Sequence, residues 1–106
     1  ELRQAVSARW QPTVQHAIAL AAATYRVDRR LLDRISYCES TYRPTARNGR
    51  YVGLAQFGLP LWNSTAYWSF DRADPYASAL GLAEKIREGG LSHWYASRHC
   101  WGGRGP

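Results

Sequence analysis

Apolar residues recur at intervals of three and four along much of this sequence, and this spacing restricts the possible folds more than any other feature. Residues 11–25 carry five of them on one helical face: Val14, Ile18, Ala21, Ala22 and Tyr25. Such a stripe is typical of a helix that packs on a core. A second helix is expected to begin near Asp28, a suitable N-cap, and to end between residues 40 and 43 because Pro44 follows.

Three further helices are expected in the second half of the chain. Pro60 can open a helix of about two turns that reaches residue 66. Asp74 and Pro75 give the clearest helix start, an N-cap carboxylate followed by a proline in the first turn. This helix ends at the glycine pair 89–90. Ser92 can cap a last helix that brings Cys100 back to the core.

Asn48 and Gly49 form a strong turn signal between two short segments, residues 46–47 and 50–52. Any β-structure here is a short hairpin. We therefore expect a mainly α fold with at most one small β-hairpin. The chain has 106 residues, so residues 1–101 are expected to form a single domain, with residues 102–106 as a disordered tail or linker stub.

The charge of the chain narrows the classes of partner without choosing among them. Basic residues outnumber acidic ones by 14 to 8, which gives a net charge of +6 and favours polyanions such as nucleic acid, anionic lipid or cell-wall polymers. No nucleic-acid-binding motif accompanies the arginines. No apolar run approaches the roughly 20 residues of a membrane span. We expect neither a nucleic-acid partner nor a membrane-spanning segment.

The two cysteines, Cys38 and Cys100, are 62 positions apart and are too few for a four-ligand zinc site. They form either one disulfide or two separate thiols. In the chain-entropy model, a bridge across a loop of this length is worth about 4 kcal/mol, a large share of the stability of a small domain. The size of the chain therefore favours the disulfide, in a compartment outside the cytosol.

Glu39 occupies an unusual place for a carboxylate. It follows Ile35 by four residues and Leu32 by seven, so it lies on the apolar face of its helix, near the C-terminal end. Poor solvation and the helix dipole both favour the protonated carboxyl group there. An acid that keeps its proton near neutral pH can protonate the leaving oxygen of a glycosidic bond. The alternative is a solvated helix-end residue, or one paired with Arg43.

Several segments around Glu39 resemble the soluble lytic transglycosylases, in which a helix ends in Glu-Ser and a Gly-Leu-x-Gln segment follows a short loop. The resembling positions are residues 31–40, 44, 46, 48–49, 53–57, 74–75 and 89–95. The Cys-Glu-Ser triplet, with a distant cysteine near a tryptophan, equally resembles the resuscitation-promoting factors. Both families have the lysozyme-like fold, so the resemblance, which covers roughly residues 14–101, implies this fold.

The resemblance also assigns roles to individual residues. It implies that Glu39 is the single catalytic acid and base, that Ser40 supports it, and that Gln56 hydrogen-bonds the glycan near the cleaved bond. Tyr95 corresponds to the aromatic hydroxyl that faces the catalytic glutamate in transglycosylases. Two further aromatic residues can stack on sugar rings of the substrate, namely Tyr51 and Trp94.

The implied reaction cleaves the β-1,4 bond between N-acetylmuramic acid and N-acetylglucosamine in peptidoglycan and forms a 1,6-anhydro sugar. A hydrolase would instead need a second carboxylate about 5–9 Å from the first. Asp71, in the aromatic segment 67–73, is the leading candidate, because helix capping already explains Asp74. A third possibility is a glycan-binding or signalling module that keeps the fold without catalysis.

These interpretations imply that the protein is a monomer that binds peptidoglycan strands. They also imply a secreted or extracytoplasmic location, in association with the cell wall. The three histidines have no metal-ligand spacing. We therefore expect neither a metal ion nor a cofactor.

Overall fold

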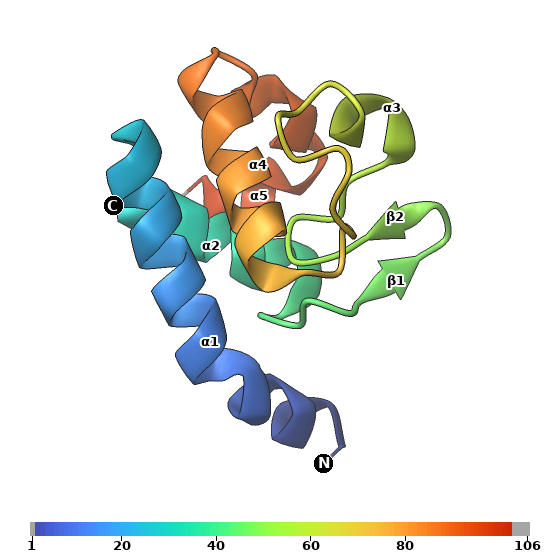
Figure 1. Cartoon of the computed structure of the whole chain (residues 1–106). Helices are drawn as coiled ribbons and strands as arrows, with labels where there is room; N and C mark the ends of the chain where they lie inside the picture. Colours follow the sequence, from blue (N-terminus) through green and yellow to red (C-terminus); the bar gives the residue numbers. More distant parts are fainter. Residues whose placement is uncertain (1, 103–106) are drawn as a thin grey trace.

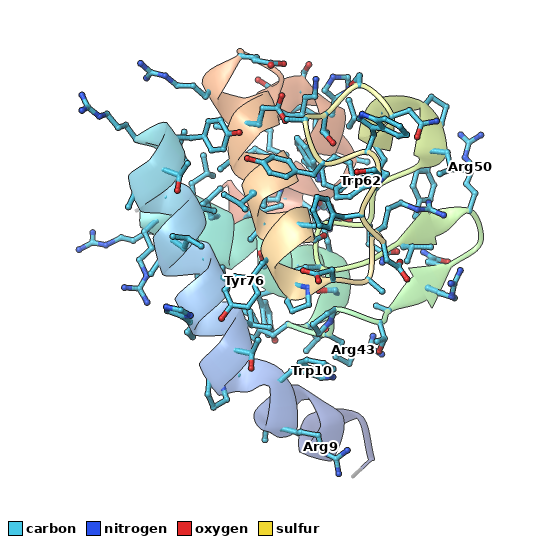
Figure 2. All side chains as sticks on the ribbon, viewed as in Figure 1. Arg9, Trp10, Arg43, Arg50, Trp62 and Tyr76 are labelled. Carbon is cyan, nitrogen blue, oxygen red and sulfur yellow. A yellow bond between two sulfur atoms is a disulfide. The ribbon has the colours of Figure 1, made fainter. Side chains whose placement is uncertain are left out.

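The framework of the fold is a pair of long helices that lie side by side, α1 (Leu2–Tyr25) and α4 (Pro75–Arg87) (Figure 1). The computed structural model describes residues 2–102, and their side chains from residue 8 onward. The contact between α1 and α4 is the most extensive of any two elements. Tyr76 reaches from α4 to α1, where its hydroxyl lies 2.6 Å from Nδ1 of His16 (Figure 2).

The remaining elements are arranged around this pair. Helix α2 spans Arg29–Ser40, α3 spans Leu59–Trp62 and α5 spans Arg98–Trp101, and a 3-10 segment, η1, spans Leu91–Ser97. Strands β1 (Arg47–Asn48) and β2 (Tyr51–Val52) pair antiparallel. Within residues 2–102 the fold is mainly α with one two-stranded hairpin, which confirms the fold class predicted from the sequence. None of the described helices has the length and apolar character needed to cross a bilayer.

Two of the three helix starts predicted from capping residues are correct. Asp28 accepts a hydrogen bond from the backbone N–H of Arg30 and caps α2. Asp74 accepts from the N–H groups of Tyr76 and Ala77 and caps α4, with Pro75 in the first turn. Such carboxylates satisfy backbone N–H groups that have no partner within the helix.

Three predicted boundaries are wrong. The first helix begins at Leu2 rather than near residue 11, so Pro12 lies inside it, and Figure 1 shows this N-terminal part extending beyond the body of the fold. Helix α3 has a single turn because the hydroxyls of Ser64 and Thr65 donate to carbonyls of residues 61 and 62. Ser92 is not a cap, because the last segment starts at Leu91, with Gly90 in the N-cap position, and is a 3-10 helix.

The hairpin turn lies one residue later than predicted. Arg47 pairs with Val52 and Asn48 with Tyr51, so Gly49 and Arg50 form the turn. Gly49 adopts a φ of +63°, a left-handed conformation that glycine adopts without steric cost. The predicted tail, residues 102–106, falls outside the described residues except for Gly102.

The core that supports the second half of the chain is aromatic. Phe57 packs edge-on against Trp62, with ring centroids 4.9 Å apart, and against Trp94, with centroids 5.6 Å apart. Gly81 lets α4 approach this cluster, because a Cβ atom there would lie only 2.9 Å from the Trp62 ring. The indole N–H of Trp94 donates to the carbonyl of Ala55 over 2.9 Å and fixes η1 against the loop after β2.

Cys38 of α2 and Cys100 of α5 form a disulfide that joins two elements 62 residues apart in sequence. The bridge is close to the carboxyl end of α2, so it fixes this helix end against the C-terminal elements. A hydrogen bond from Arg34 Nε to the carbonyl of Trp101, 2.9 Å long, joins the same two helices one turn away. The disulfide alternative of the sequence analysis is therefore the correct one.

Replacement of both cysteines by serine should lower the free energy of unfolding by about 4 kcal/mol, because the unfolded chain regains the entropy of an open loop. Urea unfolding with and without a reductant measures the loss. The Cys38→Ser/Cys100→Ser variant should be insensitive to reductant and should match the reduced wild type. An oxidised protein that unfolds at the same urea concentration as the reduced one would contradict the prediction.

Candidate active site

A cleft of about 550 Å³ opens beside the carboxyl end of α2. Its walls come from α2, the hairpin, the segment that follows β2, and η1. The lining residues are Cys38, Glu39, Asn48, Arg50, Tyr51, Gln56, Gly58, Pro60, Leu61, His93, Trp94 and Ala96. Glu39 is the only carboxylate among them. The cleft therefore contains several polar and aromatic side chains around one acid.

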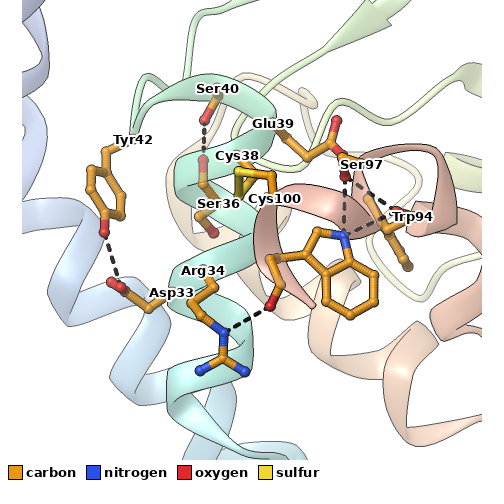
Figure 3. Close-up of a disulfide and its surroundings, with 11 residues drawn as sticks. Asp33, Arg34, Ser36, Cys38, Glu39, Ser40, Tyr42, Trp94, Ser97 and Cys100 are labelled. Atoms are coloured by element: carbon orange, nitrogen blue, oxygen red, sulfur yellow. Dashed lines mark hydrogen bonds between the residues drawn. A yellow bond between two sulfur atoms is a disulfide. The ribbon is translucent and has the colours of Figure 1, made fainter. Parts of the chain in front are cut away.

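Glu39 is half-buried in the wall of this cleft. Burial withdraws water from the carboxylate and raises the pKa of Glu39 above its ordinary value of 4.5. A hydrogen bond from the Ser97 hydroxyl to Oε2 acts in the opposite direction and lowers this pKa, but burial is the larger effect (Figure 3). The carboxyl group thus keeps its proton to a higher pH than an ordinary glutamate does. It still has a polar partner, Ser97, when it ionises.

Ser97 is suited to both protonation states of Glu39. Its hydroxyl oxygen accepts from the indole N–H of Trp101 at 3.1 Å, and it lies 3.2 Å from the carbonyl of Trp94. When Glu39 is ionised, the Ser97 hydroxyl donates to it. When Glu39 is protonated, Glu39 can donate to Ser97, and the Ser97 proton can turn toward the Trp94 carbonyl. A hydroxyl can exchange these roles because it both donates and accepts.

Ser97 is a residue of the site that was not predicted, although the sequence contains a signal for it. Glu39 directly follows Cys38, and Ser97 precedes Cys100 by three residues, which is about one helical turn. Once the two cysteines are bonded, the positions beside them are brought together. The expected pairing of the cysteines therefore also indicated which segment would face the carboxyl group.

Ser40, expected to support Glu39, is buried and stabilises the end of α2 instead. Its hydroxyl donates to the carbonyl of Ser36 over 2.9 Å and accepts from the N–H of Arg43. The side chain of Arg43 in turn donates to the Ser40 carbonyl, 3.0 Å away. Among the described residues no cation forms an ion pair with Glu39, so the alternative pairing with Arg43 is absent.

Gln56 lines the cleft in a tight turn and has a left-handed backbone, with φ +55°. Its amide nitrogen donates to the carbonyls of Ala46 and Gly53, over 3.1 and 2.9 Å. Among the side chains that the structure describes, those of residues 8–102, no other forms a hydrogen bond with it. The amide oxygen is therefore oriented by its own nitrogen and remains able to accept a hydrogen bond from a ligand.

The two aromatic residues of the cleft differ in exposure. Tyr51 of β2 is 39% exposed, whereas Trp94 is only 4% exposed. The ring of Tyr51 is thus available to stack on a ligand, while Trp94 serves mainly as the packed floor. The guanidinium of Arg50 lies 5.2 Å from the centre of the Tyr51 ring, and Arg50 also donates to the Tyr51 hydroxyl.

Tyr95 and Asp71, the other two expected site residues, do not line the cleft. Tyr95 is exposed on η1, with the guanidinium of Arg98 5.0 Å from the centre of its ring. Asp71 is exposed in the loop before α4, where its carboxylate accepts from the backbone N–H of Ala73. In the described part of the chain, no group of three histidine, cysteine or acidic side chains is placed to hold a metal ion.

No family model, curated protein or solved structure matches this chain. The geometry of the cleft is therefore the basis on which a function is assigned. This geometry combines a half-buried acid, an adjacent hydroxyl, an oriented amide and an exposed aromatic ring.

The raised pKa of Glu39 predicts that the Glu39→Gln variant gains stability relative to the wild type as the pH rises. Below the unfolded-state pKa the carboxyl group of Glu39 is protonated in both the folded and the unfolded protein, so its contribution to the free energy of unfolding is fully present. As the pH rises through the higher folded-state pKa, this contribution is lost, and the uncharged amide of the variant loses nothing.

Urea unfolding of both proteins between pH 4 and pH 8 tests this prediction. Glu88→Gln, which changes an exposed glutamate of the Lys85–Glu88 ion pair, is the control and should show no such gain. A stability difference between Glu39→Gln and the wild type that stays constant or falls with pH would contradict the raised pKa.

Proposed function

We propose that this protein cleaves the β-1,4 bond between N-acetylmuramic acid and N-acetylglucosamine in peptidoglycan, as a lytic transglycosylase of lysozyme-like architecture. One observation carries the proposal: a single carboxyl group, half-buried and with a raised pKa, lies in a cleft that has no second carboxylate among the residues that the structure describes. The resemblance of residues 14–101 to lytic transglycosylases and resuscitation-promoting factors points to the same chemistry.

The first step is protonation of the glycosidic oxygen by Glu39. An alkoxide is a poor leaving group, so the bond breaks readily only when this oxygen receives a proton as it departs. Burial keeps the proton on Glu39 above the ordinary pH range of a carboxyl group. After transfer, the Ser97 hydroxyl donates to the new carboxylate and stabilises its charge.

The second step uses the same carboxylate as a base. Glu39 takes the proton of the C6 hydroxyl of the muramyl sugar as that oxygen bonds to C1, which closes the 1,6-anhydro ring. Glu39 thereby replaces the proton that it gave to the leaving sugar with one from the muramyl sugar, and no water is consumed. One carboxyl group suffices for the whole cycle.

The other residues of the cleft fit a sugar polymer. The exposed Tyr51 ring offers an apolar face for a pyranose ring. The oriented amide oxygen of Gln56 can accept a hydrogen bond from a sugar hydroxyl or N-acetyl group. These contacts would hold the scissile bond beside Glu39.

A hydrolase has less support from the same geometry. Retaining and inverting glycosidases both use a second carboxylate near the acid. Asp71 lies outside the cleft and is hydrogen-bonded within its own loop, and Asp74 caps α4.

The disulfide and the net charge of +6 favour a protein that works outside the cytosol on an anionic wall.

Mass spectrometry of peptidoglycan digested with the purified protein tests the reaction type. We expect products that end in 1,6-anhydro-muramyl groups, lighter by one water than the products of hydrolysis. Glu39→Gln should reduce the rate of release by at least about a thousandfold while the variant still sediments with the insoluble wall.

Reducing ends of full mass would identify a hydrolase and overturn the transglycosylase proposal. Wall binding without any turnover by the wild type would identify a non-catalytic glycan-binding module. Glu84→Gln is a suitable matched control, because Glu84 lies on α4 outside the cleft and its loss should leave the products unchanged.

A further inference from the structure

We propose that a depression next to the cleft binds carboxylate groups on the peptides that the glycan strand carries. This inference rests on the proposed function and names the part of the substrate beyond the sugar backbone. The depression has a volume of about 380 Å³ and is lined by Arg47, Gly49, Arg50, Val52, Leu59, Pro60 and Arg72. We call its three basic residues, 47, 50 and 72, the arginine triad.

The arginine triad has no acidic counterpart. None of the residues that line the depression is acidic. No member of the triad forms an ion pair with any described residue. Three guanidinium groups that share one concave surface repel one another, so an anion that binds among them removes an unfavourable interaction as well as adding favourable ones.

Arg72 is pre-organised for such a ligand. One of its terminal nitrogens, Nη1, donates to the carbonyls of Arg50 and Phe57, over 2.9 and 2.8 Å. These two bonds hold the guanidinium in place and use the hydrogens of Nη1. The donors on Nε and Nη2 remain, and this edge of a guanidinium matches the two oxygens of a carboxylate.

Arg50 connects the depression to the active-site cleft. It lines both, as does Pro60. Its contacts with the Tyr51 ring and hydroxyl keep it at the rim between the two, and Figure 2 shows it at the outer edge of the molecule beside the hairpin. Asn48 and Tyr51 line the cleft, whereas the other cross-strand pair, Arg47 and Val52, lines the depression, so the two lie on opposite faces of the hairpin and meet at its turn. Side groups of a polymer in the cleft would therefore reach the triad around Arg50.

A second group of arginines includes an acidic residue and lies away from the cleft. Arg29, Arg30 and Arg34 line a separate depression on α2, but Asp33 lies among them. The Arg34 side chain is also engaged with the carbonyl of Trp101. That surface contains its own negative charge and does not adjoin the cleft. The arginine triad is thus the stronger site for an anion.

The position of the site selects the ligand. In peptidoglycan the peptides are attached to the muramic acid units of the strand itself and carry free carboxyl groups. Phosphate-rich wall polymers are another source of oxyanions, but they are not part of the sugar chain that fills the cleft. The continuity through Arg50 therefore favours the peptide carboxylates.

The test measures binding of soluble, uncross-linked glycan strands that carry peptides and have been freed of phosphate polymers. One sample keeps its peptide carboxyl groups, and in the other they are converted to amides. Binding is measured in the Glu39→Gln background, so that the strands remain intact. Arg47 is the residue to change, because it is exposed on β1 and its loss disturbs neither the cleft nor the Arg72 hydrogen bonds.

We expect amidation of the strands to raise the Kd for Glu39→Gln roughly threefold, the effect of an exposed ion pair. Addition of Arg47→Gln should raise the Kd for free-carboxyl strands by a smaller factor and should reduce the difference between the two samples, because Arg50 and Arg72 remain. Arg87→Gln, which removes an exposed arginine from the last turn of α4, is the matched control and should preserve the difference.

Equal affinity of Glu39→Gln for both samples would overturn the inference and leave the proposed function intact, because wild-type cleavage is measured separately. An Arg47→Gln effect seen with soluble polyglycerol phosphate but not with the strands would also overturn it, in favour of a phosphate polymer. Absence of cleavage by the wild type, together with carboxylate-dependent binding, would overturn the proposed function alone. Failure of both samples to bind, together with absence of cleavage by the wild type, would overturn both.

Discussion

The arrangement of the site depends on the covalent bond between Cys38 and Cys100. Cys38 is adjacent to Glu39 on α2, and Cys100 follows Ser97, at the end of η1, by three residues. Glu39 and Ser97 form the central hydrogen bond of the site. The elements that carry them are short and distant in sequence, and neither could fix the orientation of the other alone. The disulfide removes this freedom, and the hydrogen bond from Arg34 to Trp101 adds a second point of attachment.

The proposed chemistry follows from opposing influences on the pKa of one carboxyl group. Burial disfavours its charge, and the Ser97 hydroxyl partly offsets this effect. A fully buried carboxyl group would hold its proton too firmly to give it up and then act as a base. An exposed one would already have lost the proton at neutral pH and could not act as an acid. The half-buried position beside Ser97 lies between these limits. The arginine triad adjoins the cleft through Arg50 and, in our proposal, binds carboxylates that the sugar chain carries.

The features predicted most reliably from the sequence were those with a local physical cause. The caps at Asp28 and Asp74 depend on a few neighbouring atoms, and the apolar spacing placed Glu39 on a half-buried face. The cleft depends on contacts between distant segments, and no local pattern specifies these. The resemblance implied that Ser40 supports the acid, but the Ser40 hydroxyl donates to the Ser36 carbonyl instead. Ser97, from the other end of the chain, donates to Glu39. Asp71 illustrates the same limit. Its hydrogen bond to Ala73 depends on neighbouring residues, whereas its position outside the cleft depends on how distant segments pack.

The claim on which the account depends is that Glu39 holds its proton above the ordinary range of a carboxyl group. A carbon-13 NMR titration that follows the Glu39 side-chain carboxyl measures this pKa directly. The account predicts a midpoint above 4.5 in the wild type, and a further increase in Ser97→Ala, which lacks the hydrogen bond that lowers it. A wild-type midpoint at or below 4.5, unchanged by Ser97→Ala, would contradict the account.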